Sequence, residues 1–128
     1  MGEIRLYREL DVWQASMDLA VTVQKLADRL PADHRFGLAS RSSLSIPSNV
    51  AEGHAYGAER IFLRHVRIAL ASLAEVETQI ELAKRLDLLR SSMDAALPSL
   101  LVRTGQLLHG TRRSLMKRLA ASHKKREK

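Results

Sequence analysis

The sequence predicts an all-α protein that folds as a single antiparallel up-down-up-down four-helix bundle over residues 1–128. Three observations predict this fold. Apolar residues recur every three or four positions through four segments, no long run alternates with period two, and the breaks between segments are short. A chain of 128 residues is long enough for one domain with one hydrophobic core.

The first expected helix runs from Asp11, which can act as its N-cap, to Leu30, where Pro31 ends it. Trp13, Met17 and Ala20 widen its apolar stripe on one side, so this helix faces the core. The stripe itself consists of Val12, Ala15, Leu19, Val23, Leu26 and Leu30.

The second segment, Phe36 to Tyr56, is ambiguous, because Pro47 lacks an N–H and crowds the carbonyl of Ser43, which would kink a helix. Gly53 and Gly57 indicate a turn after it. A weak apolar stripe contains Phe36, Ala39, Ser43, Ile46 and Val50, and a polar stripe beside it contains Ser42, Ser45, Asn49 and Glu52.

The third segment has the clearest pattern, a seam with steps of four and three that suits bundle packing. The seam contains Phe62, Val66, Ala69, Leu73, Val76, Ile80 and Ala83. The apolar residues Ile61, Leu63, Ile68, Leu70 and Ala71 point elsewhere. A helix that is apolar on more than one side is buried on more than one side, so we expect another subunit there. Ser72, Glu75 and Gln79 form a polar line that either fixes the register of this interface or is a half-exposed flank.

The fourth segment begins near Leu97 or Pro98, since proline favours the first turn of a helix. Its opposite face carries Arg103, Gln106, Gly110, Arg113 and Lys117. We expect ordered helices over residues 10–121 and a frayed basic tail at 122–128, joined by loops at Pro31–Arg35, His54–Ala58 and Leu88–Asp94. The apolar stripe of this helix contains Met93, Leu97, Leu100, Thr104, Leu107 and Thr111, followed after a phase slip by Leu115 and Leu119.

The charge of the chain is concentrated at one end. Residues 1–56 have a net charge of −1 and residues 57–94 a net charge of zero, whereas residues 95–128 carry nine Lys or Arg and only Glu127, a net charge of +8. This asymmetry suggests an anionic partner. The lack of cysteine excludes disulfides, thiolate catalysis and Cys-type zinc sites. The lack of a long apolar stretch or a signal-peptide core predicts a cytoplasmic protein without a membrane anchor.

Four short motifs occur in order between residues 9 and 90: Asp11-Val-Trp-Gln-Ala, Phe36-Gly-Leu, Ser45-Ile-Pro-Ser-Asn-Val-Ala-Glu-Gly and Ser72-Leu-Ala-Glu-Val-Glu-Thr-Gln. With these motifs the chain resembles the 23S rRNA intervening-sequence protein family, also called four-helix-bundle proteins. It departs from the family pattern in the segment from Leu38 to Ser45, which is about three residues shorter and contains only Arg41 in place of an arginine pair. Three residues are nearly one helical turn, so the helix face is roughly kept.

The resemblance implies a left-handed bundle whose members assemble as ring-shaped pentamers and whose genes often lie within insertions in bacterial 23S rRNA genes. A related branch is the accessory variability protein of diversity-generating retroelements, a basic pentamer that binds nucleic acid and its partner reverse transcriptase. The resemblance brings no defined biochemical activity, so it leaves the function open between binding and scaffolding.

Catalysis finds little support. His34, His54, His65, His109 and His123 lack metal-ligand spacing, and there is no glycine-rich phosphate loop, so we expect no enzyme, metal or cofactor. Ser45, Asn49 and Glu52 share a helix face and invite interpretation as a binding or catalytic carboxylate with amide support. We favour a structural polar cluster, in which Ser45 and Ser48 satisfy groups freed by Pro47 and Glu52 pairs with an arginine such as Arg64.

Binding is better supported, because Arg60, Arg64 and Arg67 share a face of the third segment and can join the basic fourth segment in contacting phosphates. Aromatic residues make up only 4% of the chain, which excludes a base-stacking platform. We therefore predict an oligomer that binds RNA or DNA through phosphate contacts. The alternative is a ring-shaped adaptor that recruits a nucleic-acid enzyme such as a reverse transcriptase. The residues expected to bind are Arg103, Arg112, Arg113, Lys117, Arg118, Lys124, Lys125 and Arg126, and those expected between subunits are Ile61, Leu63, Ile68, Leu70 and Gln79.

Overall fold

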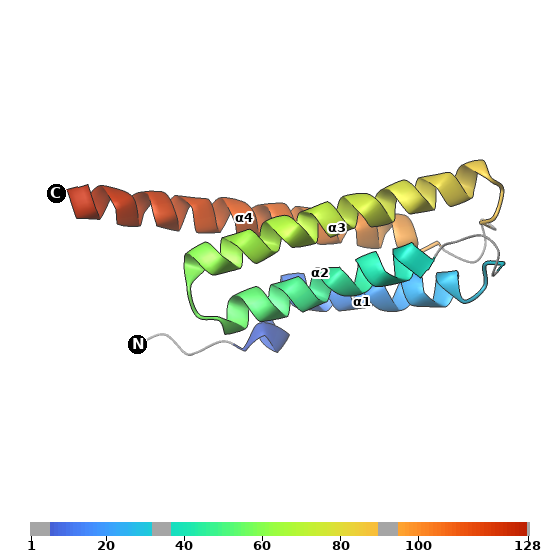
Figure 1. Cartoon of the computed structure of the whole chain (residues 1–128), viewed down its shortest axis with the longest axis horizontal. Coiled ribbons are helices and arrows are strands. Elements are labelled where there is room, and N and C mark those ends of the chain that lie inside the picture. Colours follow the sequence, from blue (N-terminus) through green and yellow to red (C-terminus); the bar gives the residue numbers. More distant parts are fainter. Residues whose placement is uncertain (1–5, 32–36, 90–94, 128) are drawn as a thin grey trace.

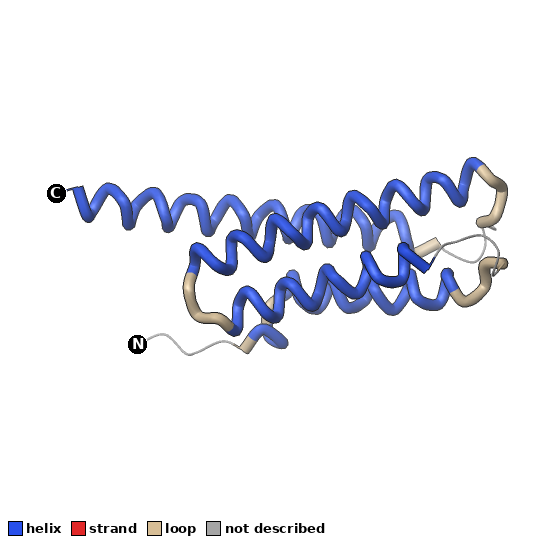
Figure 2. Tube along the Cα trace, in the orientation of Figure 1, coloured by secondary structure: helices blue, strands red, loops and turns tan. Residues whose placement is uncertain are grey.

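A computed structural model of the chain describes residues 6–31, 37–89 and 95–127. It contains a short 3₁₀ helix, η1 (Tyr7–Glu9), and four α-helices: α1 (Asp11–Ala27), α2 (Gly37–Ala55), α3 (Glu59–Arg85) and α4 (Leu97–Glu127). Within these ranges the chain has only helices, turns and loops and no strand (Figure 2). The prediction of an all-α protein is confirmed.

Consecutive helices run in opposite directions (Figure 1). α2 packs against both α1 and α3, and α4 packs against both α1 and α3, so that the four helices enclose one core. α4 is longer than its neighbours, and its C-terminal end extends past the turn between α2 and α3 (Figure 1). The expected loop residues 32–35 and 90–94, with the stripe residues Phe36 and Met93, lie outside the described residues.

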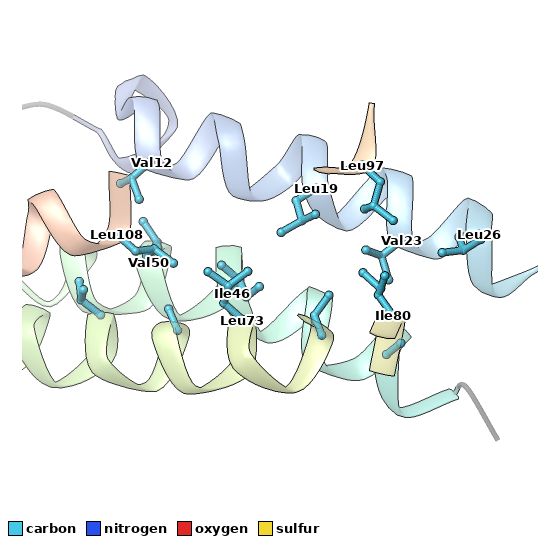
Figure 3. Close-up of a cluster of buried hydrophobic side chains, with 14 of the residues drawn as sticks. Val12, Leu19, Val23, Leu26, Ile46, Val50, Leu73, Ile80, Leu97 and Leu108 are labelled. Carbon is cyan, nitrogen blue, oxygen red and sulfur yellow. The ribbon is translucent and has the colours of Figure 1, made fainter. Parts of the chain in front are cut away.

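The core contains side chains from all four helices (Figure 3). Leu19, Ile46, Leu108 and Leu115 are the largest fully buried side chains. Most of the α3 seam is buried as predicted, and Phe62 at its start is half-buried. In α4, Leu108 is fully buried and the predicted Leu107 is half-buried, because the shift in the apolar stripe occurs between Thr104 and Leu108 and not after Thr111. The spacing of apolar residues therefore identifies the buried face of α1, that of α3 except for Leu63, and that of α4 to within one residue.

The ends of α1 differ from the prediction. Leu10 is the N-cap, and its carbonyl accepts the backbone N–H groups of Trp13 and Gln14 at 3.1 Å, while Asp11 is already the first helical residue. The helix ends at Ala27, and two further turn-like bonds continue to Leu30. A residue before proline is disfavoured in the helical conformation, so the chain leaves the helix before it reaches Pro31.

α2 continues as one helix through Pro47, which is buried. α3 ends in a Schellman motif: the N–H of Leu88 donates to the carbonyl of Ala83 at 3.0 Å and that of Asp87 to Lys84 at 3.0 Å. Asp87 occupies the left-handed position of this motif, with φ of 57°. α4 stays helical to Glu127, beyond Ala121 where we expected fraying.

Candidate nucleic-acid interface

The predicted phosphate-binding residues lie along α4 and are mostly exposed. Arg113, Lys117 and Lys124 are exposed on the side of the helix opposite to Leu108 and Leu115, and Arg103 is exposed nearly three turns before Arg113, about 80° round the helix from it. Arg112 is half-buried. Arg118, Lys125 and Arg126 are exposed on other sides of the helix. Arg113, Lys117 and Lys124 thus form one row on the outer face, and the cations beyond Leu115 that are not in this row lie on other sides of the helix.

One of these cations is held within the protein. The guanidinium of Arg118 lies 3.8 Å from the Glu59 carboxylate at the start of α3 and donates a hydrogen bond to Ser114 Oγ at 3.1 Å. Among residues 6–31, 37–89 and 95–126, the seven other predicted binding residues have no acidic partner within ion-pair distance. Their charges are available to an external anion.

Two clefts lie between α4 and the end of the bundle where α3 begins. One, of about 480 Å³, is lined by Leu10, Phe62, Leu107 and Arg118, among others. The second, of about 530 Å³, is lined by both Arg60 and Arg126. The structure therefore brings Arg60 of α3 and Arg126 of α4 to one hollow, whereas Arg64 and Arg67 are exposed further along α3.

The apolar residues predicted at a subunit interface fall into two groups. Leu63 is 7% exposed and belongs to the protein's own core, so our placement of it on a second surface is wrong. Leu70 also packs partly against the core. Ile68 is 40% exposed and Ile61 is half-buried, and Leu82 near the end of α3 and Leu86 just after it are also exposed. Separate apolar side chains therefore remain on this side of α3, with the exposed Glu75 between Ile68 and Leu82.

The structural polar cluster lies between α2 and α3. Ser45 Oγ is 2.8 Å from Ser72 Oγ, and the amide of Asn49 donates both to Ser45 Oγ at 3.0 Å and to the Ser45 carbonyl at 2.8 Å. Asn49 Oδ1 lies 2.9 Å from His65 Nδ1. Ser45 and Asn49 are therefore used to join two helices.

The acidic members of this seam have partners that we did not predict. Glu52 Oε2 lies 4.0 Å from His65 Nδ1, so its partner is His65 and not Arg64. Ser42 Oγ donates to Glu75 Oε2 at 2.7 Å, so Glu75 joins α2 to α3 while its side of the helix remains exposed. Gln79, on the same line, has a buried Oε1 to which no group in the described residues donates a hydrogen bond.

His65 could have been found from the sequence, because it lies seven residues before Ser72 and extends the Ser72–Glu75–Gln79 line by two helical turns. Glu59, the partner of Arg118, had no such signal, since nothing in the sequence gives the height of α4 relative to α3. In the described ranges no three His, Asp or Glu side chains gather as metal ligands. No helix there is long and apolar enough to span a membrane.

The comparison with known families matches the 23S rRNA-intervening sequence protein profile over residues 8–110. The chain belongs to this family. A comparison with curated protein sequences gives no match. The family region ends within α4, so the intervening-sequence protein fold covers the bundle while the second half of α4 lies beyond it. Of the predicted binding residues, only Arg103 lies inside the matched region.

Proposed function

We propose that this protein is a non-enzymatic, cytoplasmic, oligomeric protein that binds RNA or DNA through phosphate contacts of the basic half of α4. The observation that carries the proposal is the position of its charge. Residues 111–128 contain eight Lys or Arg and one Glu, a net charge of +7, whereas residues 1–110 contain thirteen basic and thirteen acidic residues. All of the net charge of the chain therefore belongs to residues 111–128, which lie outside the family match.

Assembly would multiply this charge. The exposed Ile68, Leu82 and Leu86 on α3 offer apolar surface to a second copy. In the pentamer that the family resemblance suggests, five subunits would carry a net charge of +35. Such a field attracts polyanions and raises their association rate at low salt.

The test is a salt titration on short RNA and DNA, with the mass of the protein measured by light scattering in the same buffers. A phosphate-binding surface predicts that log K falls linearly with log salt, with a slope of about −0.9 per contact on duplex DNA. Reversing Arg113, Lys117, Lys124 and Lys125 to Glu should abolish binding. Absence of binding by the unaltered protein at about 50 mM salt, with the oligomer intact, would contradict the proposal.

A matched control separates local contact from overall charge. Lys25, Arg29, Arg41 and Lys84 are exposed near the opposite end of the bundle (Figure 1), and reversing these four to Glu changes the net charge by the same amount. We expect this control to retain most of the affinity. Equal losses in the two variants would mean that only net charge matters and that α4 is not the contact surface.

A second candidate, an adaptor for a protein partner, is favoured by exposed apolar side chains on α4. Val102 is 59% exposed and Met116 47% exposed, and they lie fourteen residues, nearly four turns, apart along one side. An adaptor that docks there would keep its partner after charge reversal of α4 and lose it when Val102 and Met116 are changed to Glu. A nucleic-acid-binding protein would show the opposite pattern.

A further inference from the structure

Three hollows follow one another along α4, where this helix passes the turn between α2 and α3. We call the first the apolar cleft, of about 480 Å³, and the last the cationic hollow, of about 530 Å³. A third hollow, of about 200 Å³, lies between them, because it shares lining residues with each. The shared residues are His54, Phe62, Leu115 and Arg118 on the side of the apolar cleft, and Gly57, Ala58 and Glu59 on the side of the cationic hollow. The three hollows together form one elongated groove, which we call the α4 groove.

The surface of the apolar cleft is mainly apolar, with a few polar groups. Phe62 and His54 pack edge-to-face with their ring centroids 5.5 Å apart, so two rings line this end of the groove. Its aliphatic side chains are Leu10, Val12, Leu107 and Leu115. Sites for small organic molecules have this composition and this range of volume.

The polar groups of the apolar cleft can still form hydrogen bonds with a ligand. Thr111 Oγ1 donates to the Leu107 carbonyl at 2.8 Å, so its oxygen can accept a further bond. Ser114 Oγ accepts from Arg118 at 3.1 Å, so its hydroxyl hydrogen can be donated. The amide of Gln106 has no partner among the described residues, and it offers both a donor and an acceptor. The apolar cleft therefore suits a ring that has polar atoms along its edge.

The cationic hollow lies at the other end of the groove. Arg60 of α3 and Arg126 of α4 both line it, and in the described part of the chain neither has a carboxylate within ion-pair distance. Glu59 also lines this hollow, but its carboxylate lies 3.8 Å from the guanidinium of Arg118, which offsets its charge. Guanidinium groups bind phosphate oxygens through pairs of charge-assisted hydrogen bonds. This end of the groove therefore suits phosphate groups.

The distance between the two ends limits the choice of ligand. Thr111 in the apolar cleft and Ser122 in the cationic hollow are eleven residues apart on α4, which corresponds to about 16 Å. An inorganic anion would use only the cationic end, and an uncharged ring would use only the apolar end. An alkyl phosphate would reach both ends but would give the polar groups of the cleft no partner. A nucleoside with a chain of phosphates provides a ring with a polar edge and anionic groups some distance away.

We propose that the α4 groove binds a nucleoside triphosphate, with the base beside Phe62 in the apolar cleft and the phosphate chain extending to Arg60 and Arg126. A nucleoside monophosphate is too short for this arrangement, because its single phosphate is attached directly to the ribose. The site goes beyond the proposed function, since the row of cations on the outer face of α4 does not line the groove.

The experiment is isothermal titration calorimetry of the protein with ATP, GTP, CTP and UTP, and with inorganic triphosphate and the four nucleosides as probes for each end alone. We expect at least one nucleotide to bind about tenfold or more tightly than inorganic triphosphate and than its own nucleoside, because it uses both ends of the groove. If no nucleotide binds more tightly than inorganic triphosphate, only charge is recognised and the inference is wrong. Tighter binding of dodecyl phosphate than of every nucleotide would also overturn it.

A double substitution tests the cationic end. Replacing Arg60 and Arg126 with Gln should weaken nucleotide binding about tenfold or more, through loss of charge-assisted hydrogen bonds to phosphate. Arg64→Gln combined with Arg113→Gln is the matched control, because it changes the same two helices and the same charge at exposed residues that do not line the groove. We expect this control to retain the affinity. Equal losses in the two variants would contradict the assignment.

Gly110→Leu tests the apolar end without altering charge. Gly110 lines the apolar cleft, and a Cβ there would lie at an ordinary contact distance of 3.7 Å from the Arg113 guanidinium, so the larger side chain fits but fills the cleft. Leucine also favours the helix over glycine, so the melting temperature should not fall. We expect nucleotide affinity to drop to that of inorganic triphosphate, whereas the salt-dependent affinity for duplex DNA should remain. Unchanged nucleotide affinity in Gly110→Leu would overturn the inference. Loss of DNA binding by the unaltered protein would instead contradict the proposed function.

Discussion

The two halves of α4 have the same secondary structure but different surroundings. The first half contributes Leu97, Thr104 and Leu108 to the core, and the buried stripe ends at Leu115. The second half carries the net positive charge and contacts little of the bundle. One continuous helix thus joins a charge-balanced body to a cationic extension. This difference indicates that the first half of α4 serves packing and the second half is available for ligand binding. Substitutions can therefore alter stability and binding separately.

The strongest contrast should come from truncating two leucines of α4. Leu108 is 0% exposed, so Leu108→Ala leaves a cavity in the core and should lower the free energy of unfolding by about 3–4 kcal/mol. Leu119 is half-buried on the extension, and Leu119→Ala should cost about 1 kcal/mol or less. Urea unfolding followed by circular dichroism measures both. Similar losses for the two variants would mean that the extension is part of the cooperative core.

The next effect concerns the closest approach of α2 and α3. A methyl group at Gly53 would lie 2.6 Å from Cβ of His65, which is fixed to the α3 backbone, so Gly53→Ala should destabilise the bundle by about 1–3 kcal/mol. Gly37→Ala is the matched control, because no atom of the described residues lies within 4 Å of the added methyl group. Thermal unfolding of the pair distinguishes crowding from the loss of glycine flexibility. An unchanged melting temperature for Gly53→Ala would show that the seam is looser than described.

A smaller effect is expected where the basic end of α4 contacts the start of α3. Glu59→Gln removes the exposed ion pair with Arg118, which should change stability by only about 0.5 kcal/mol. The released guanidinium should then be available to phosphate and steepen the salt dependence of duplex DNA binding by up to about 0.9 in slope. Salt titrations of the two proteins measure this difference. Glu81→Gln, which breaks the ion pair to Arg85 at the other end of α3, should leave the slope unchanged.

The smallest effect lies far from the extension. Asp87 has φ of 57° at the end of α3, a conformation that glycine adopts at lower cost, so Asp87→Gly should stabilise the protein by about 0.5–1 kcal/mol. Denaturant unfolding checks the sign. Asp87 follows the end of α3, which lies at the opposite end of the bundle from the C-terminal end of α4 (Figure 1). The nucleic-acid affinity should therefore not change. Destabilisation would indicate that the carboxylate of Asp87 contributes more than its backbone strain costs.

Much of the fold could be predicted from the sequence, since the spacing of apolar residues in α1 and α3 fixes which faces are buried. The predicted ends of the helices were less accurate. Asp11 has the side chain of an N-cap, but Leu10 takes that position, because the backbone of η1 and α1 decides where the helix begins. The second segment, which was ambiguous because of Pro47, is one helix that continues through this buried proline.

The sequence predicts which residues of a candidate site share a helix face, but not which residues of the neighbouring helices they contact. Ser45 and Asn49 were placed on one polar face, and their partners Ser72 and His65 depend on the rotation of α3 against α2, which periodicity does not give. The same holds for Leu63, whose side chain points into the core because α4 covers that side of α3. The sequence alone predicts that the cations lie on α4. It does not predict that most of them are exposed, because this depends on how far α4 extends past the neighbouring helices.

The helical state of the extension has its own thermodynamic origin. Isolated helices shorter than about 12–15 residues are marginal in water, because the first turn is costly to nucleate. The exposed residues 120–126 of α4 avoid that cost, since the packed turns up to Leu119 provide the nucleus and each later residue only propagates the helix. Helix–coil cooperativity therefore makes the hydrophobic contacts of Leu115 and Leu119 a condition for the order of the exposed residues that follow them, and this part of the cationic surface persists only while the bundle remains folded.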